Sequence, residues 1–231
     1  MRSGGAEMAP RVLLWGGRSQ ARIVAALLGR QGIVPAAVFD PTLDAPAFGT
    51  AARFVNRVED LRPLLPGFSH AVVSMGGHHG AQRAAVAAAL RDRFGLAPLS
   101  VVSPKASVDP DASLGEGVQV MLGACIGLGA EVGAFSIVNT NATIDHECRL
   151  GAGVHVMGAA AVAGRVQMGR HVTVGTNATV LPDLTIGDGA QIGAAALVRH
   201  DVPADTVVVG VPARPLRRES PQVDLSILDA L

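Results

Sequence analysis

The sequence predicts two domains of different class: an α/β domain with a parallel sheet over residues 10–101, and a parallel β-helix over residues 102–216, followed by a tail over 217–231. Two observations carry this prediction. Strand-like and helix-like segments alternate in the first part, and an apolar residue recurs at every sixth position in the second. The chain is 49% hydrophobic but only 3% aromatic, with no Tyr, which suits a thin, regular core of small and β-branched side chains.

The first part of the chain contains short apolar runs separated by turns and by segments with helical spacing. In the first helical segment, Ile23, Ala26, Leu27 and Arg30 recur at helical intervals. We expect strands at 11–15, 34–40, 70–75 and 97–102, and helices at 20–31, 58–65 and 81–94. Strands that alternate with helices favour a parallel sheet.

The second part has a strict six-residue period. Every sixth residue from Val102 to Val198 is apolar, at all 17 positions, and the residue four places further on is mostly small. Glycine often follows the apolar residue, which argues against a helix because each glycine costs about 1 kcal/mol there. A six-residue repeat is typical of a parallel β-helix, in which like residues stack from coil to coil and each backbone group meets a partner above or below.

Composition excludes several classes of protein. The formal net charge is +0, so the chain lacks the basic face that a nucleic-acid binder needs. Cys125 and Cys148 form no CxxC pair and indicate neither a disulfide framework nor a zinc site, which suits a reducing compartment. The first residues lack a signal-peptide pattern, and no apolar run approaches the roughly 18 residues of a membrane helix. We therefore expect a cytoplasmic protein.

One segment of the repeat, residues 139–164, contains a group of polar and ionisable residues. Asp145, His146 and Glu147 are consecutive, and His155 follows half a coil later. A lone histidine here is usually an outward-facing polar residue, but neighbouring carboxylates can hold an imidazole in one tautomer and raise its basicity. Cys148 occupies an inward position of the repeat and is expected to be a small core residue.

The repeat resembles that of the hexapeptide acyltransferases, whose left-handed β-helix has triangular coils of three repeats and which assemble as trimers with active sites between adjacent prisms. Residues 139–151, NTNATIDHECRLG, match the motif of one branch, the sugar acetyltransferases with a Rossmann-like N-terminal domain. That branch includes the bacillosamine-pathway and perosamine N-acetyltransferases and the sialic-acid O-acetyltransferases. The resemblance extends from about Arg11 to Leu216.

The resemblance implies roles for individual residues. His146 would be the general base, oriented by Glu147, with Asp145 a weaker candidate for the orienting role. Gly164 matches the glycine whose backbone N–H faces the thioester oxygen of acetyl-CoA. Asn139 and His155 match positions near the acceptor.

The resemblance also implies a coenzyme A segment near the end of the β-helix. Besides Gly164, the small residues Gly175, Ala194 and Ala195 would let the pantetheine arm lie along the prism. Arg199 would contact a phosphate of coenzyme A, and Pro212 would lie beside the adenine. Acetyl-CoA is the expected co-substrate, and no metal is expected.

The first domain offers candidate nucleotide contacts. Gly16 and Gly17 lie between a strand and a helix, where backbone N–H groups can approach a phosphate, although GGRSQA is not a GxGxxG motif and does not predict NAD binding. Asp40 ends the second strand. The branch usually has a Gly-His pair where this chain has Ser19 and Gln20, a second acid where it has Pro41, and a shorter loop at His78 and His79. These departures fall where the nucleotide of the acceptor would bind.

The leading hypothesis is therefore a homotrimeric enzyme that N-acetylates an amino sugar linked to a nucleotide. O-acetylation of a sugar such as a sialic acid is the first alternative. A zinc-dependent carbonic anhydrase would need three converging histidines, for which His146, His155 and His171 are available at spacings unlike that family's. A non-catalytic scaffold would need neither the Asp-His-Glu run nor bound coenzyme A.

Overall fold

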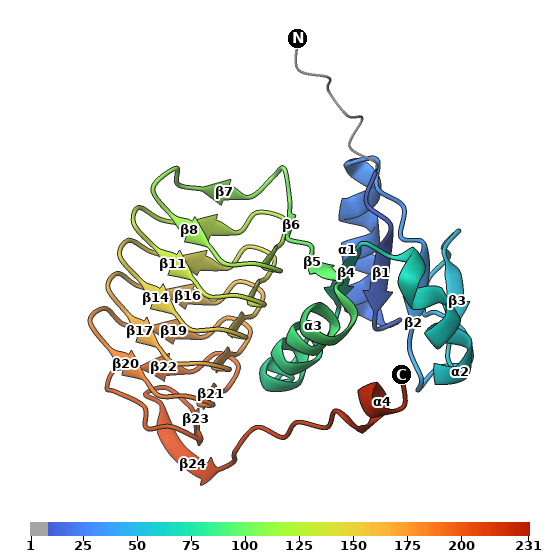
Figure 1. Ribbon diagram of the computed structural model, residues 1–231. Helices are drawn as coiled ribbons and strands as arrows, with labels where there is room; N and C mark the ends of the chain where they lie inside the picture. The colour runs from blue at the N-terminus through green and yellow to red at the C-terminus, as the bar shows by residue number, and fades with distance from the viewer. Residues whose placement is uncertain (1–8) are drawn as a thin grey trace.

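The computed structural model describes residues 9–231, and in it an α/β domain lies beside a three-sided column of short strands (Figure 1). The α/β domain contains a five-stranded parallel sheet in the order β3-β2-β1-β4-β5. Its strands are Val12–Trp15 (β1), Ala37–Phe39 (β2), Arg53–Val55 (β3), His70–Val73 (β4) and Ala97–Pro98 (β5). Its helices are Ser19–Arg30 (α1), Val58–Leu61 (α2), the 3₁₀ helix Arg62–Gly67 (η1) and Gly80–Phe94 (α3).

The two faces of this sheet are covered by different helices. Val12 and Leu14 pack with the apolar residues of α1, whereas Leu13 and Trp15 pack with those of α2, η1 and α3. This alternation follows from the two-residue period of a strand, and an apolar run such as VLLW is the pattern expected of a strand buried on both faces.

The structure differs from the predicted elements at three places. Strand β3 was not predicted, because RFV is a three-residue edge strand that follows a loop rich in Pro, Ala and Gly. The predicted helix at 58–65 changes to a 3₁₀ helix at Arg62, since Pro63 and Pro66 cannot donate backbone hydrogen bonds. The predicted strand at 97–102 is divided: β5 completes the first sheet, and Val101–Val102 (β6) pairs with the β-helix.

The column consists of three sheets whose strands are joined at three corners. The β7–β22 sheet contains Ser107–Val108 (β7), Cys125–Ile126 (β10), Thr143–Ile144 (β13), Ala161–Val162 (β16), Thr179–Val180 (β19) and Leu197–Val198 (β22). The β8–β20 sheet contains Ser113–Leu114 (β8), Glu131–Val132 (β11), Arg149–Leu150 (β14), Gln167–Met168 (β17) and Thr185–Ile186 (β20). The β6–β24 sheet contains Val101–Val102 (β6), Gln119–Val120 (β9), Ile137–Val138 (β12), His155–Val156 (β15), Thr173–Val174 (β18), Gln191–Ile192 (β21), Thr206–Val209 (β23) and Arg214–Arg218 (β24).

Each coil of the column takes 18 residues, as the pairing of Cys125 with Thr143 shows (143 − 125 = 18). The apolar and small residues that recur every six positions fill the core of the column. Cys148 is fully buried among them, as predicted. Glycines recur because successive coils approach closely: a Cβ on Gly151 would lie 2.8 Å from the backbone nitrogen of Arg170. The strict sequence period thus corresponds to one side of a triangular coil.

Polar contacts join the α/β domain to the β6–β24 sheet and its adjoining corner. Arg83 of α3 is only 1% exposed, and its guanidinium donates to the carbonyl oxygens of Met75, Phe135, Gly153 and Val154. The Gln20 amide donates to Gln119, which in turn donates to the carbonyl of Val73. These contacts place the carboxyl edge of the five-stranded sheet against one side of the column.

The chain end returns to the α/β domain. After the antiparallel pair β23 and β24 at the base of the column, an extended segment leads to a short helix, Ser226–Asp229 (α4), which lies near α2 and α3 (Figure 1). Leu228 of this helix is fully buried in the apolar cluster of the α/β domain. Among residues 9–231, no helix is long and apolar enough to cross a membrane.

Candidate active site

A cavity of about 760 Å³ lies where the carboxyl ends of β1, β2 and β4 face the column. In an open parallel sheet this edge, where the strand order reverses, is the usual place for a ligand. Four of the predicted substrate residues, Gly16, Asp40, Asn139 and His155, line the cavity, but Gly17 does not. Among these four residues, positions up to 139 apart in the chain come together from both domains (155 − 16 = 139).

The loop after β1 has a backbone geometry that requires glycine. Gly16 has a φ of 103°, and a Cβ there would lie 3.1 Å from the carbonyl oxygen of Ser74. The Gly17 N–H donates to Asp40 Oδ2 at 2.9 Å, and Asp40 Oδ1 accepts from the N–H and hydroxyl of Thr42. Asp40 therefore holds the loops at the cavity edge, and neither of its oxygens is left without a donor.

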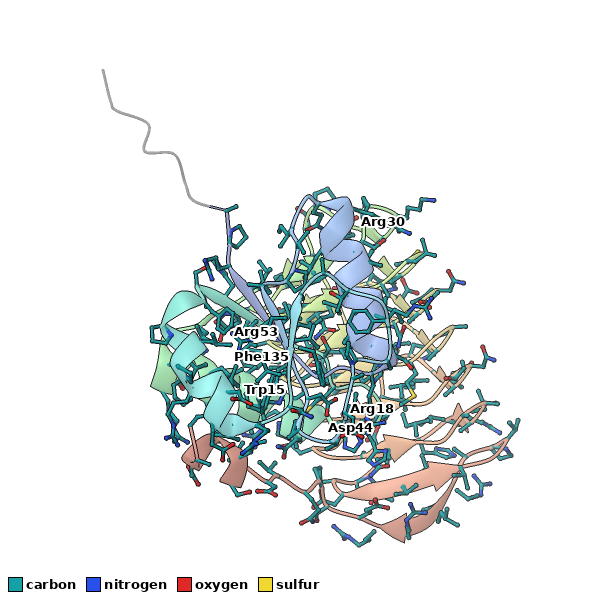
Figure 2. The ribbon with its side chains drawn as sticks, turned by 90° about the vertical axis from the view of Figure 1, so that its right-hand side faces the viewer. Trp15, Arg18, Arg30, Asp44, Arg53 and Phe135 are labelled. Atoms are coloured by element: carbon teal, nitrogen blue, oxygen red, sulfur yellow. The ribbon has the colours of Figure 1, made fainter. Side chains whose placement is uncertain are left out.

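Arg18 also lines the cavity and was not among the predicted site residues. Its guanidinium donates to Thr42 Oγ1 at 3.0 Å, and Figure 2 shows Arg18 and Arg30 at opposite ends of α1, with Arg18 at the end nearer Trp15. A cation at the N-terminus of a helix is suited to an anionic ligand such as a phosphate. The sequence signal was available, since Arg18 directly follows the Gly-Gly turn.

His155 is held as a neutral imidazole at the wall of the cavity. It is 2% exposed, its Nδ1 lies 2.8 Å from the carbonyl oxygen of Gly77, and its Nε2 lies 3.2 Å from Asn139 Nδ2. The carbonyl can only accept, so Nδ1 carries the proton and Nε2 accepts from Asn139. Burial, reinforced by the nearby charge of Arg83, lowers the pKa of His155 to about 4.

His146 and Glu147 form a second cluster, at a corner of the column. The His146 ring is 41% exposed, and its Nδ1 lies 3.1 Å from Glu147 Oε2. A proton on Nδ1 would be shared with this carboxylate and leave the lone pair on Nε2. Asp145 instead accepts from the backbone N–H of His146 at 2.7 Å, so Glu147 is the carboxylate that contacts the ring.

Gly164 lies directly against the His146 ring. A Cβ on Gly164 would be 2.5 Å from His146 Nε2 and 2.7 Å from Cε1. Among residues 9–231, the Gly164 N–H meets no hydrogen-bond acceptor. Nearby, Arg165 pairs with Asp183 through both carboxylate oxygens, at 2.6 and 2.8 Å, and this pairing lowers the pKa of Asp183.

The two clusters lie on different sides of the column. His146 follows β13 and Gly164 follows β16, so both occupy the corner between the β7–β22 and β8–β20 sheets, one coil apart. His155 lies on the β6–β24 sheet, which faces the α/β domain. The corner that holds His146 and Gly164 lies on the side of the column away from that domain (Figure 1). Within one chain, the structure therefore does not bring His146 to the cavity that Asn139 and His155 line.

The predicted coenzyme A residues border the β7–β22 sheet from both edges. Gly164 and Arg199 lie at the corner with His146, while Gly175, Ala194 and Ala195 lie at the opposite corner, where a Cβ on Gly175 would be 2.6 Å from the Ala194 nitrogen. Pro212 lies in the turn between β23 and β24, beside Ala213, whose N–H donates to Leu197. A groove of about 470 Å³ lies along this sheet and reaches Asp145 and Ala163.

No three His, Cys, Asp or Glu side chains within residues 9–231 are grouped so that they could hold a metal ion. His171, the third histidine of the carbonic anhydrase alternative, is half-buried, and burial lowers its pKa. The ring of His155 is already bonded to Gly77 and Asn139.

No model of a protein family matches the chain, and no curated protein sequence does. Solved structures do match over nearly the whole chain. The perosamine N-acetyltransferase PerB from Caulobacter crescentus, solved with CoA and GDP-perosamine, is 33% identical with a TM-score of 0.80, covering 90% of this chain and 97% of its own. With this match, the chain belongs to the hexapeptide-repeat acetyltransferases of the sugar-modifying branch, and its column is the left-handed β-helix of that family.

Two further structures are similar to the protein. The acetyltransferase domain of PglB from Neisseria gonorrhoeae FA1090 is 27% identical, covers 90% of this chain and 100% of its own, and has a TM-score of 0.77. It has also been solved with acetyl coenzyme A. WeeI from Acinetobacter baumannii AYE is 25% identical, covers 89% and 99%, respectively, and has a TM-score of 0.77. The predicted family and the predicted class of enzyme, an acyltransferase, are thereby confirmed.

Proposed function

We propose that this protein transfers the acetyl group of acetyl-CoA to the amino group of a nucleotide-linked amino sugar. The observation that carries the proposal is the contact of His146 Nε2 with Gly164. The Gly164 N–H has no acceptor within residues 9–231, and the other nitrogen of the His146 ring, Nδ1, contacts the carboxylate of Glu147. A base and a backbone donor at one point are what acyl transfer from a thioester requires. The ligands of PerB, CoA and GDP-perosamine, support the choice of substrates.

The chemistry follows from this arrangement. His146 Nε2 accepts a proton from the amine as its nitrogen attacks the thioester carbonyl carbon, and Glu147 stabilises the resulting imidazolium. The Gly164 N–H donates to the carbonyl oxygen as it becomes an oxyanion, a contribution worth about 3–4 kcal/mol in comparable sites. The carbon–sulfur bond then breaks, the new amide is released, and His146 returns the proton to the coenzyme A thiolate.

The acceptor cavity suits the other substrate. Arg18 and the N-terminus of α1 provide positive charge at the carboxyl edge of the sheet, where a diphosphate would lie. Asn139 and His155 line the same cavity from the column and would contact the sugar. No acidic residue occupies the first turn of α1, so nothing in that turn repels an anion.

The separation of the two clusters supports a homotrimer. In one chain the His146 corner lies away from the α/β domain, so the cavity and the base cannot meet on the same sugar. Under cyclic symmetry, the cavity of one chain faces a different surface of the next. We infer that the acetyl group is transferred at this interface, where the His146 corner of one chain meets the cavity of its neighbour.

The test is release of free thiol from acetyl-CoA against a panel of GDP-, UDP- and dTDP-linked amino sugars. We expect turnover with at least one sugar, lost in His146→Ala but not in His70→Ala, which alters a histidine at the amino end of β4, away from the cavity. Protein that binds coenzyme A but acetylates none of the amino sugars would contradict the proposal. A hydroxyl acceptor of the sialic-acid type would then be tested with the same assay.

A further inference from the structure

The C-terminal strap, residues 220–231, crosses from the base of the column to the α/β domain and contributes two residues, Asp224 and Ile227, to the lining of the acceptor cavity. Neither was singled out by the sequence. The strap is therefore part of the site as well as a connection between the two ends of the chain.

Specific contacts hold the strap in this position. The Gln82 side-chain amide donates to the backbone carbonyl of Asp224 and accepts from the Asp224 N–H at 2.6 Å. Both polar atoms of this amide are therefore hydrogen-bonded to the backbone of the strap. Arg93 donates to Asp229 and to the carbonyl of Leu228, each at 2.9 Å, and Arg62 donates to the carbonyl of Ala230. Leu228 is fully buried beneath these bonds.

The strap completes the apolar part of the cavity. Ile227 packs in the same apolar cluster as Trp15, Phe39 and Val86, and all four line the cavity. Much of the remaining lining is polar, including Arg18, Thr42 and His155. The least polar, flat part of a nucleotide-linked sugar is its base, which gains most from such a surface.

We propose that the strap is a wall of the nucleobase subsite, with Ile227 in contact with the base, and that it sets the affinity for the nucleotide. This inference rests on the proposed function for the identity of the acceptor. It assigns the strap no step in acetyl transfer, so its effect should fall on binding of the nucleotide and not on coenzyme A.

The experiment measures binding of GDP, UDP and dTDP to the full-length protein by calorimetry. Ile227→Ala should weaken the tightest of these by about tenfold, from the lost contact of the side chain, and leave coenzyme A binding unchanged. Val223→Ala is the matched control, because Val223 lies on the same strap, is 49% exposed and does not line the cavity. Equal affinities for Ile227→Ala and the parent chain would overturn the inference.

Hydrogen exchange provides a second readout that does not depend on a variant. Binding of the nucleoside diphosphate should slow exchange of the Asp224 and Leu228 amides, whereas coenzyme A alone should not. Unchanged exchange in the strap on nucleotide binding would contradict its place in the subsite. A parent chain that binds none of the three nucleotides would instead refute the proposed acceptor, which separates the two failures.

Discussion

Replacing Gly164 with alanine tests the arrangement of base and backbone donor at a single atom. The new Cβ would lie 2.5 Å from His146 Nε2 and 3.1 Å from Cδ2, whereas ordinary contacts begin at 3.4 Å. The imidazole must therefore move by about 1 Å, and a displacement of that size in a reacting group costs about 100-fold in rate. We expect kcat for acetyl transfer to fall by about this factor.

The assay is steady-state release of free thiol at saturating acetyl-CoA and acceptor. Gly158→Ala is the control, because Gly158 occupies the same position one repeat earlier (164 − 158 = 6) and a Cβ there would meet only Thr140, at 3.5 Å. Gly158→Ala should keep the parent kcat and the parent unfolding temperature. If Gly164→Ala were as active as Gly158→Ala, Gly164 could not lie beside the reacting atoms, and the reasoning would be refuted.

Three other substitutions test separate parts of the account. Glu147→Gln keeps an acceptor for His146 Nδ1 but removes the charge, so kcat should fall by about tenfold, less than the 10²–10⁴-fold expected of His146→Ala; equal losses would contradict an orienting role. His155 has a pKa of about 4 when folded and near 6.5 when unfolded, so the unfolded chain binds more protons as the pH falls between these values. The free energy of unfolding therefore contains the full contribution of His155 above about pH 6.5, and it falls by about 3 kcal/mol as the pH drops toward 4. His155→Asn should make the free energy of unfolding less dependent on pH in this range. An unchanged pH dependence would contradict the lowered pKa. Arg83→Met leaves the carbonyls of Met75, Phe135, Gly153 and Val154 without their donor and should lower the free energy of unfolding in urea by about 3–5 kcal/mol; a loss below about 1 kcal/mol would show that water replaces the guanidinium.

The column could be predicted from the sequence because its period is local. Each six-residue repeat contributes the same side of a coil, so an apolar residue such as Val156 or Val174 has its place set by its neighbours in the chain. The parallel sheet was predicted in outline, but edge strand β3 was not, since three residues carry too little periodicity. The apolar run at 97–102 also gave no sign that the chain passes there from one sheet to the other.

The cluster at the His146 corner follows from local spacing, whereas Asn139 and His155 were expected near the acceptor only through the family resemblance. His146 and Glu147 are adjacent, and Gly164 lies 18 residues after His146 (164 − 146 = 18), one coil, so the spacing alone stacks them at one corner. By the same spacing, His155 lies half a coil from His146, which indicates a different side of the column. The contacts of Arg83 with the column and those that hold the strap join positions 52 to 168 residues apart, and no local pattern marks such pairs.

The central claim is that the acceptor cavity of one chain works with His146 of a neighbouring chain. It can be tested by co-expressing, with different tags, His146→Ala and Ser19→Trp, the latter placing an indole in the cavity from an exposed position on α1. Each variant alone should be inactive in the thiol-release assay. In mixed trimers isolated through both tags, one intact cavity faces one intact His146, so about one third of the parent activity should return. Mixed trimers as inactive as the single variants would contradict the claim.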